Sequence, residues 1–354
     1  MLLRKILFPI AALNYLLQSS KSFFYSKKIL KAHKTKVNTI CVGNLSLGGT
    51  GKTPLVKFLI ERLSEKINIS VLSRGYKRKT KGFIEVSDES DVNDVGDENF
   101  MIKKSFKKIN VFACENRLNA INKILKKFSD VDLIILDDAM QHRKIKCDLN
   151  ILLTKFEQPF YNDLIFPVGD LREPRIGYKR ANIIIVTKCP DNLTNSEKEN
   201  IINKIKPLNH QRIFFSKVDY EDILKGKRDI HISALKTDFL LVTGIADSLP
   251  LTRYLKSKKY KFNHLIFNDH HSYNQNDIRK ILKLSQDKII LTTKKDYFKI
   301  LSIHEIKNLY YIDITIDFFG KSNDLIGLIA EKFRIEKEKR DKELKEVARM
   351  RNKD

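Results

Sequence analysis

The chain has no tryptophan and little glycine, proline or cysteine, with 13, 8 and 4 of these among its 354 residues. The cysteines are far apart and form no CxxC pair, which excludes the usual zinc spacings and a disulfide framework: Cys41, Cys114, Cys147 and Cys189. No apolar run reaches the roughly 20 residues needed to span a bilayer. We therefore expect a globular protein of a reducing cytosol, with one large domain or two modest ones.

Acidic residues are also scarce, because 43 Asp and Glu face 67 Lys and Arg and leave a net charge of +24. Such an excess predicts an anionic partner or surface. Nucleic acid is the first candidate, yet no motif that reads DNA or RNA is present, and the lysines are spread over the whole chain. We expect no nucleic-acid partner.

The most informative segment is Gly43-Asn-Leu-Ser-Leu-Gly-Gly-Thr-Gly-Lys-Thr53. It follows an apolar run, 37–42, that is typical of a buried strand, and precedes a helix-like segment, 52–66. Backbone N–H groups of such a loop and of the helix N-terminus bind phosphate oxygens. Ser46 stands where the usual pattern begins with glycine. The residues predicted to hold a nucleoside triphosphate are Gly48, Gly49, Thr50, Gly51, Lys52 for the β/γ-phosphates, and Thr53, whose hydroxyl would reach Mg²⁺.

A carboxylate pair, Asp137-Asp138, ends the apolar run 131–136. Downstream of a phosphate loop, this is the Walker B arrangement, in which one carboxylate holds Mg²⁺ and the other orients a reactant. Further apolar runs alternate with helix-like segments, as in a parallel sheet: strands at 69–72, 111–113, 149–153 and 183–187, and a helix at 117–128. The predicted fold is a P-loop NTPase-like α/β/α sandwich with a mostly parallel sheet.

A second strand–helix series begins at residue 239, after a polar stretch at 225–237. We therefore divide the chain into a core at 35–230, a smaller C-terminal α/β lobe at 231–330 and a charged tail at 331–354, read as a solvated helix. Residues 2–17 are apolar and are followed by five lysines between 21 and 34, with no small-residue cleavage site. We interpret residues 1–34 as an amphipathic helix at a membrane interface. The alternative is a helix docked on the protein's own core.

Several polar segments resemble, in order up to about residue 300, those of the tetraacyldisaccharide 4′-kinase (lipid A 4′-kinase) family. Besides the phosphate loop they are Ser73–Tyr76, Val95–Glu98, Leu136–Arg143, Pro167–Pro174 and Phe267–Tyr273. The resemblance implies an ATP- and Mg²⁺-dependent kinase that phosphorylates the 4′-hydroxyl of tetraacyldisaccharide 1-phosphate, an anionic glycolipid, and so makes lipid IVA in lipid A biosynthesis. It also implies peripheral attachment to the cytoplasmic face of the bacterial inner membrane, and an active site between the two lobes.

The resemblance further implies roles for individual residues. Asp97 would act as the base toward the sugar hydroxyl, although it could also cap the helix that follows. His270 would hydrogen-bond to Asp97, with Asp269 orienting the imidazole. The remaining assignments are Asp137 and Asp138 on Mg²⁺, with Asp138 and Arg172 also acting on the transition state, Gln141 near the nucleotide, and Tyr76, Arg117 and Glu173 at the acceptor.

The sequence departs from the family pattern at two places. Ala139 and Met140 replace Gly-Phe after the carboxylate pair, which puts the local backbone in doubt, because alanine tolerates positive φ poorly. Asp170 replaces a proline before Arg172, whose alternative role is a surface ion pair with Glu173.

Two other classes stay open at this stage. The segment 293–296, Thr-Lys-Lys-Asp, matches a guanine-reading pattern and would suit a GTPase. The phosphate loop also occurs in membrane-associated partitioning ATPases, although the additional lysine of that class is absent from 44–47.

Overall fold

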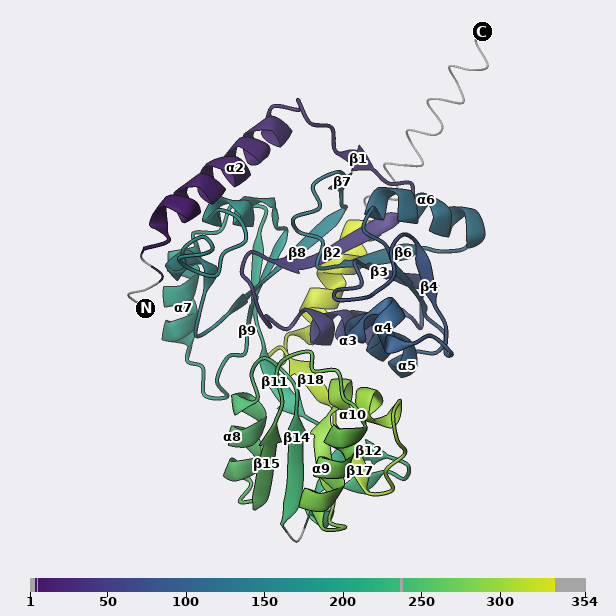
Figure 1. The fold of residues 1–354 in the computed structure, drawn as a ribbon. Helices are drawn as coiled ribbons and strands as arrows, with labels where there is room; N and C mark the ends of the chain where they lie inside the picture. Colours follow the sequence, from purple (N-terminus) through teal and green to yellow (C-terminus); the bar gives the residue numbers. More distant parts are fainter. Residues whose placement is uncertain (1–3, 5, 236–237, 335–354) are drawn as a thin grey trace.

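The computed structural model describes residue 4 and residues 6–235 and 238–334, which fold into two α/β lobes (Figure 1). Residues 2, 3 and 5 of the apolar N-terminus and residues 335–354 of the predicted tail lie outside the described residues. Residues 322–334 are helical.

The first lobe is built on an eight-stranded sheet in which every pairing is parallel except that of β4 with β5. Its inner strands are almost wholly buried, because helices cover both faces and leave no side for alternating polar residues. The spatial order is β10 (Arg212–Phe215), β9 (Ile183–Thr187), β8 (Leu149–Lys155), β2 (Asn38–Asn44), β6 (Leu133–Asp137), β3 (Ile69–Ser73), β5 (Asn110–Ala113) and β4 (Ile84–Val86).

Two hydrophobic clusters lie on opposite faces of this sheet. The first contains the apolar stripes of α6 (Arg117–Lys127) and α7 (Asn195–Ile205). The second contains those of α3 (Lys52–Leu63), α5 (Asp97–Ser105) and the helical residues 322–334. The α/β/α sandwich with a mostly parallel sheet is therefore confirmed.

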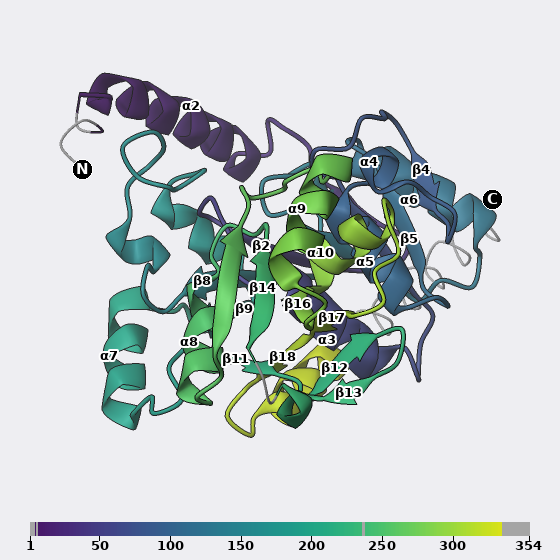
Figure 2. The ribbon, with the colours of Figure 1, turned by 60° about the horizontal axis from the view of Figure 1, so that its bottom comes forward.

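The second lobe is built on a smaller, six-stranded mixed sheet. Helix α8 (Leu249–Ser257) packs with one apolar cluster, and α9 (Gln275–Ser285) and α10 (Lys294–Leu301) pack with the other (Figure 2). The strand order is β13 (Ile230–His231), β12 (Ile223–Gly226), β17 (Leu309–Ile312), β16 (Ile290–Thr293), β14 (Phe239–Thr243) and β15 (Phe262–Ile266).

The chain crosses between the lobes twice, through the antiparallel pair β11 (Lys217–Tyr220) and β18 (Ile314–Asp317) (Figure 1). Strands β12 and β13 belong to the second sheet although they precede residue 231. After β18 the chain returns to the first lobe, where Phe318, Leu325 and Ile329 are buried. The second sheet therefore occupies 223–312, rather than the span 231–330 expected from the sequence, because strand pairing between distant segments decides lobe membership.

Helix α2 (Phe8–Ser26) lies along the outside of the first lobe (Figure 1). Ala11 is the only buried residue of α2. The helix is attached to the first lobe by a hydrogen bond from Asn14 Nδ2 to the carbonyl of Phe166 at 2.9 Å. Just before the helix, Arg4 pairs with Asp170 at 3.0 Å. No helix among the described residues is long and apolar enough to cross a membrane. The helix and its flanks expose many large apolar side chains: Ile6, Phe8, Ile10, Leu13, Leu16, Leu17, Phe23, Phe24, Ile29 and Leu30.

Short elements complete the fold. They are the paired strands β1 (His33–Lys34) and β7 (Ile145–Lys146), the helix α4 (Val92–Val95), and the 3₁₀ turns at Phe160–Asn162, Arg175–Arg180 and Ile232–Ala234.

Candidate active site

The phosphate loop lies between the carboxyl end of β2 and the first turn of α3, where parallel sheets bind ligands. Gly48 and Gly51 both have φ near 90°, a conformation that favours glycine. Gly51 is the residue before α3, so the backbone N–H groups of the first helical turn, which have no partner within the helix, lie next to the loop. Ser46, in place of the expected glycine, has no positive φ and is tolerated in the turn.

Lys52 and Thr53 are the first two residues of α3. The Lys52 Nζ lies 3.5 Å from Asn44 Oδ1 and 3.6 Å from Asp138 Oδ1. Gly49 and Thr50 complete the loop between Gly48 and Gly51, and the Thr50 carbonyl accepts a hydrogen bond from Thr187 at the end of β9. The loop thus contacts strands on both sides of β2.

The two carboxylates after β6 have different environments. Asp137 is fully buried, and neither of its carboxylate oxygens has a hydrogen-bond partner among the described residues. Burial raises the pKa of Asp137 to about 8, and the nearby Glu98 adds to this effect. Asp138 accepts a hydrogen bond from Arg172 at 2.8 Å. Burial alone would raise the pKa of Asp138, but the charges of Lys52 and Arg172 outweigh it and hold that pKa below its usual value.

The Ala139 substitution does not disturb this turn. The residue with positive φ is Asp138, at 48°, and Ala139 is not among the positive-φ residues. Met140 is buried, and its Cβ lies where a Cβ on Gly43 would be only 2.6 Å away. The close approach therefore requires glycine at position 43 of β2, whereas position 139 tolerates alanine.

Gln141 and Glu173 form a hydrogen-bonded chain that ends at Asn44, the last residue of β2 before the phosphate loop. Glu173 is buried and accepts two hydrogen bonds from Arg180, at 2.7 and 2.8 Å. The Gln141 amide donates to the Asn44 carbonyl at 2.7 Å and to Glu173 at 3.1 Å. Both side chains are thus occupied by protein partners, which favours a supporting role over the predicted contacts with acceptor and nucleotide. Arg172 pairs with Asp138, not with Glu173.

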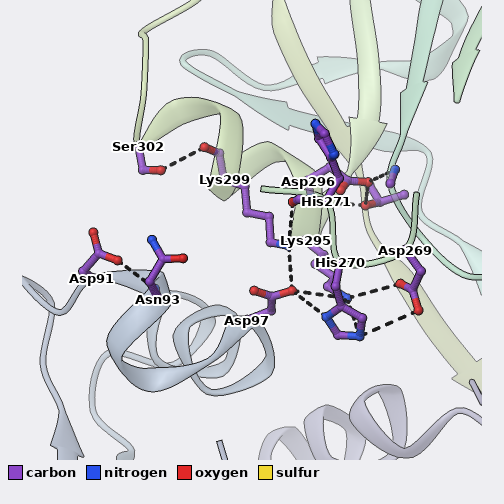
Figure 3. A network of polar contacts seen from close by, with 12 residues as sticks. Asp91, Asn93, Asp97, Asp269, His270, His271, Lys295, Asp296, Lys299 and Ser302 are labelled. Atoms are coloured by element: carbon purple, nitrogen blue, oxygen red, sulfur yellow. Dashed lines mark hydrogen bonds and ion pairs between the residues drawn. The ribbon is translucent and has the colours of Figure 1, made fainter. Parts of the chain in front are cut away.

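A second cluster forms where the lobes meet (Figure 3). Asp97 is the first residue of α5, after Gly96 with φ 87°, and His270 follows β15 in the other lobe. The Nδ1 atom of His270 lies 2.9 Å from Asp97 Oδ2, and Asp269 lies farther, 3.7 Å from Nε2. The ring of Tyr76 meets the imidazole edge-on at 5.3 Å between centroids.

Two lysines that sequence reasoning did not select complete this cluster. Lys299 Nζ lies 2.6 Å from Asp97 Oδ2, and Lys295 Nζ lies 3.4 Å from the same atom. Burial alone would raise the pKa of Asp97, but the hydrogen bonds from His270 and Lys299, with the charge of Lys295, hold it far below its usual value. Lys295 lies in the Thr-Lys-Lys-Asp segment, whose match to a guanine-reading pattern suggested a different role. Lys299 belongs to no motif.

Two arginines, Arg74 and Arg117, lie near the carboxylate pair that follows β6. Arg117, at the start of α6, is buried, and its Nε has no hydrogen-bond partner among the described residues. Burial lowers the pKa of Arg117, the Arg74 charge lowers it further, and Asp137 and Asp138 oppose the effect. A surface hollow of about 600 Å³ is lined by residues 74–81 and Glu115, whose carbonyl accepts a hydrogen bond from Arg117 at 3.2 Å.

The Thr-Lys-Lys-Asp segment does not present a base-reading carboxylate. Asp296 is fully buried and accepts hydrogen bonds from the Gly244 N–H and the Thr293 hydroxyl, both at 2.8 Å. It therefore ties α10 to β14, which removes the structural basis for the GTPase interpretation.

The sandwich with its phosphate loop, the carboxylates on the neighbouring strand and the facing lobe define a P-loop kinase. Comparison with known proteins identifies the particular group. The profile of the tetraacyldisaccharide-1-P 4′-kinase family matches residues 3–334, and the chain belongs to this family.

Similar proteins agree with this assignment. The tetraacyldisaccharide 4′-kinase of Flavobacterium johnsoniae is 41% identical over 321 residues, covering 90% of this chain and 94% of the relative. That of Bacteroides fragilis is 36% identical over 340 residues, covering 89% and 90%. A crystal structure of LpxK from Aquifex aeolicus in complex with ATP has a TM-score of 0.76 and 29% identity, over 94% of this chain and 99% of the other.

Proposed function

We propose that this kinase transfers the γ-phosphate of ATP to the 4′-hydroxyl of tetraacyldisaccharide 1-phosphate. The observation that carries the proposal is the meeting of Asp97 and His270 across the lobes, beside a complete phosphate loop. A loop that binds triphosphate could serve hydrolysis alone. A partly buried carboxylate paired with an imidazole supplies what transfer to an alcohol needs in addition, a base directed at a hydroxyl.

The nucleotide triphosphate would lie on the loop 48–53, with backbone N–H groups and the Lys52 ammonium on the β- and γ-phosphates. Arg172 is paired with Asp138 at 2.8 Å, and its guanidinium would stabilise the charge of the transferring phosphoryl group. The pairing with Asp138 keeps the guanidinium oriented before the nucleotide arrives.

The residues beside the loop fit Mg²⁺. Asp137 offers two buried carboxylate oxygens that have no partner among the described residues, an arrangement that a hard cation satisfies. Thr53 and Asp137 would hold the ion, and Asp138, whose oxygens face Lys52 and Arg172, would act at longer range. No cluster of three or more acidic, His or Cys side chains suited to a metal occurs in the described part of the chain. Kinases hold Mg²⁺ with one or two carboxylates plus substrate phosphates. The bound ion would neutralise charge on the phosphates.

The acceptor would enter at the hollow lined by Arg74 and Tyr76, with Arg117 behind it. Asp97 Oδ2 is engaged by three donors from the second lobe, so Oδ1 is the oxygen that can accept the 4′-hydroxyl proton. The anionic 1-phosphate would be matched by the arginines at 74 and 117. The acyl chains of the acceptor would remain in the bilayer. The exposed apolar residues of α2 would be inserted at the cytoplasmic face of that bilayer.

The test is transfer of labelled γ-phosphate from ATP with Mg²⁺ to detergent-solubilised tetraacyldisaccharide 1-phosphate, with GTP and acceptor-free controls. Labelled lipid that disappears in Lys52→Ala supports the kinase. Free phosphate without labelled lipid would instead support the partitioning-ATPase alternative. Preference for GTP would revive the GTPase interpretation.

A further inference from the structure

Lys299 joins the two parts of the candidate dyad. Its Nζ lies 2.6 Å from Asp97 Oδ2 and donates a hydrogen bond to the His271 carbonyl at 3.2 Å, one residue after His270 (Figure 3). Its side chain is 7% exposed, so this ammonium is largely withdrawn from water. A buried charge is costly unless it is paired, and here the pairing is with the proposed base.

The loop that carries His270 has an unfavourable backbone conformation that other contacts must stabilise. His270 has φ of 60°, a conformation that is unfavourable for a residue other than glycine. Its backbone is fixed by its N–H donating to the Gly244 carbonyl at 3.3 Å and, through the next residue, by Lys299. The facing helices are aligned independently by Phe100 of α5 against Phe298 of α10, with ring centroids 6.1 Å apart.

We propose that Lys299 is a positioning residue for phosphoryl transfer: its ammonium holds the Asp97 carboxylate on Oδ2 and fixes the His270 loop against it. The inference rests on the proposed function, because it assumes that Asp97 acts as the base. Oδ1 is then the oxygen turned to the acceptor hydroxyl, and the second lobe supplies the charge that completes the site only when α10 lies against α5.

Other charged groups surround the same carboxylate and define what Lys299 adds. Lys295 is farther, at 3.4 Å, and is shared with His270, whose Nδ1 lies 3.0 Å from it. Asp269 and Glu98 are negative and would not replace a lost ammonium. Lys299 alone combines the shortest contact to Asp97 with a contact to the histidine loop.

The experiment compares Lys299→Ala with Lys283→Ala, a control at an exposed position on α9 of the same lobe. Both remove one positive charge and a lysine stem. For Lys299→Ala we expect kcat to fall about 10- to 100-fold, part of the 10²- to 10⁴-fold that general-base catalysis supplies. We expect KM for ATP to change by less than about threefold, because no ground-state contact to nucleotide is removed. The control should match the unaltered enzyme.

Chemical rescue separates positioning by charge from mere space filling. Propylammonium, which replaces the atoms from Cγ to Nζ, should restore part of kcat in Lys299→Ala, whereas propan-1-ol, of the same size but neutral, should not. Equal rescue by both, or a kcat within about threefold of the unaltered enzyme, would overturn the inference. If the alanine variant loses its native circular dichroism, Lys299→Met keeps the packing of the stem, and its kcat must fall likewise.

The Asp97→Asn variant distinguishes a failure of the proposed function from a failure of the role proposed for Lys299. Full activity in Asp97→Asn would remove the base, and with it both the proposed chemistry and this inference. An inactive Asp97→Asn together with an active Lys299→Ala would leave the proposed function intact and refute only the role of Lys299.

Discussion

The residue whose loss we expect to destabilise the protein most is Asp313, between β17 and β18. One carboxylate oxygen lies 2.6 Å from Nζ of Lys57 in the phosphate-loop helix α3, and the other lies 2.5 Å from Nζ of Lys294 in α10. Side-chain exposure is 10% for Asp313, 7% for Lys57 and 12% for Lys294. This triad therefore joins the two lobes where the chain crosses between them.

Asp313→Asn keeps the shape and leaves two buried ammonium groups without a counter-charge. Breaking a buried pair in this way costs about 3–5 kcal/mol. The exposed pair Lys225–Asp229 has the same kind of contact, 2.7 Å, with side-chain exposures of 37% and 49%. Water screens it, so Asp229→Asn should cost about 0.2–1 kcal/mol.

The pH dependence of the difference follows from the direction of the pKa shift. Burial alone would raise the pKa of Asp313, but Lys57 and Lys294 outweigh it and hold the pKa below its usual value. The ionised group therefore stabilises the fold above the unfolded pKa of about 3.9. The difference between the unaltered protein and Asp313→Asn should stay constant from pH 8 to pH 5 and shrink as the pH falls through the lower, folded value.

The assay is urea unfolding of the unaltered protein, Asp313→Asn and Asp229→Asn at a series of pH values, followed by far-UV circular dichroism. Equal losses in the two variants would refute the argument that burial sets the cost. So would a loss in Asp313→Asn that grows as the pH is lowered from 8 to 5.

Two further predictions concern magnesium and the membrane. Burial raises the pKa of Asp137 to about 8, so the carboxylate must lose a proton before it binds a cation. The thermal stabilisation given by Mg²⁺ with a non-hydrolysable ATP analogue should therefore weaken as the pH falls below 8. The affinity for Mg²⁺ should fall by up to about tenfold per pH unit. Asp137→Asn should abolish this dependence, and an unchanged slope in that variant would place the metal elsewhere. Exchanging the exposed Leu13 and Leu17 of α2 for serine should weaken flotation with anionic vesicles, since burying each leucine contributes about 1.5–3 kcal/mol. Leu282 and Leu284, exposed on α9, are the matched control, and equal vesicle binding by both double variants would contradict an interface helix at α2.

The sequence by itself determined the phosphate loop, the carboxylate pair and the alternation of strands and helices. These features are local: glycines at 48 and 51 adopt positive φ, and apolar runs of 4–8 residues flanked by helices form buried parallel strands. The family resemblance, carried by short segments spread over the chain, was confirmed by the family profile over residues 3–334.

The tertiary structure decided which side chains meet. Asp97 and His270 are 173 positions apart, and the lysines that hold Asp97 arrive on a helix that sequence reasoning associated only with a GTPase pattern. The sequence interpretation predicted neither the helix α10 nor the packing of its lysine-bearing face against α5. Glu173 and Gln141 likewise turned out to be occupied by Arg180 and the Asn44 carbonyl. Local propensity acts over one or two turns, whereas burial and charge pairing depend on how distant segments pack, so the partners of each carboxylate emerge only when both lobes are folded together.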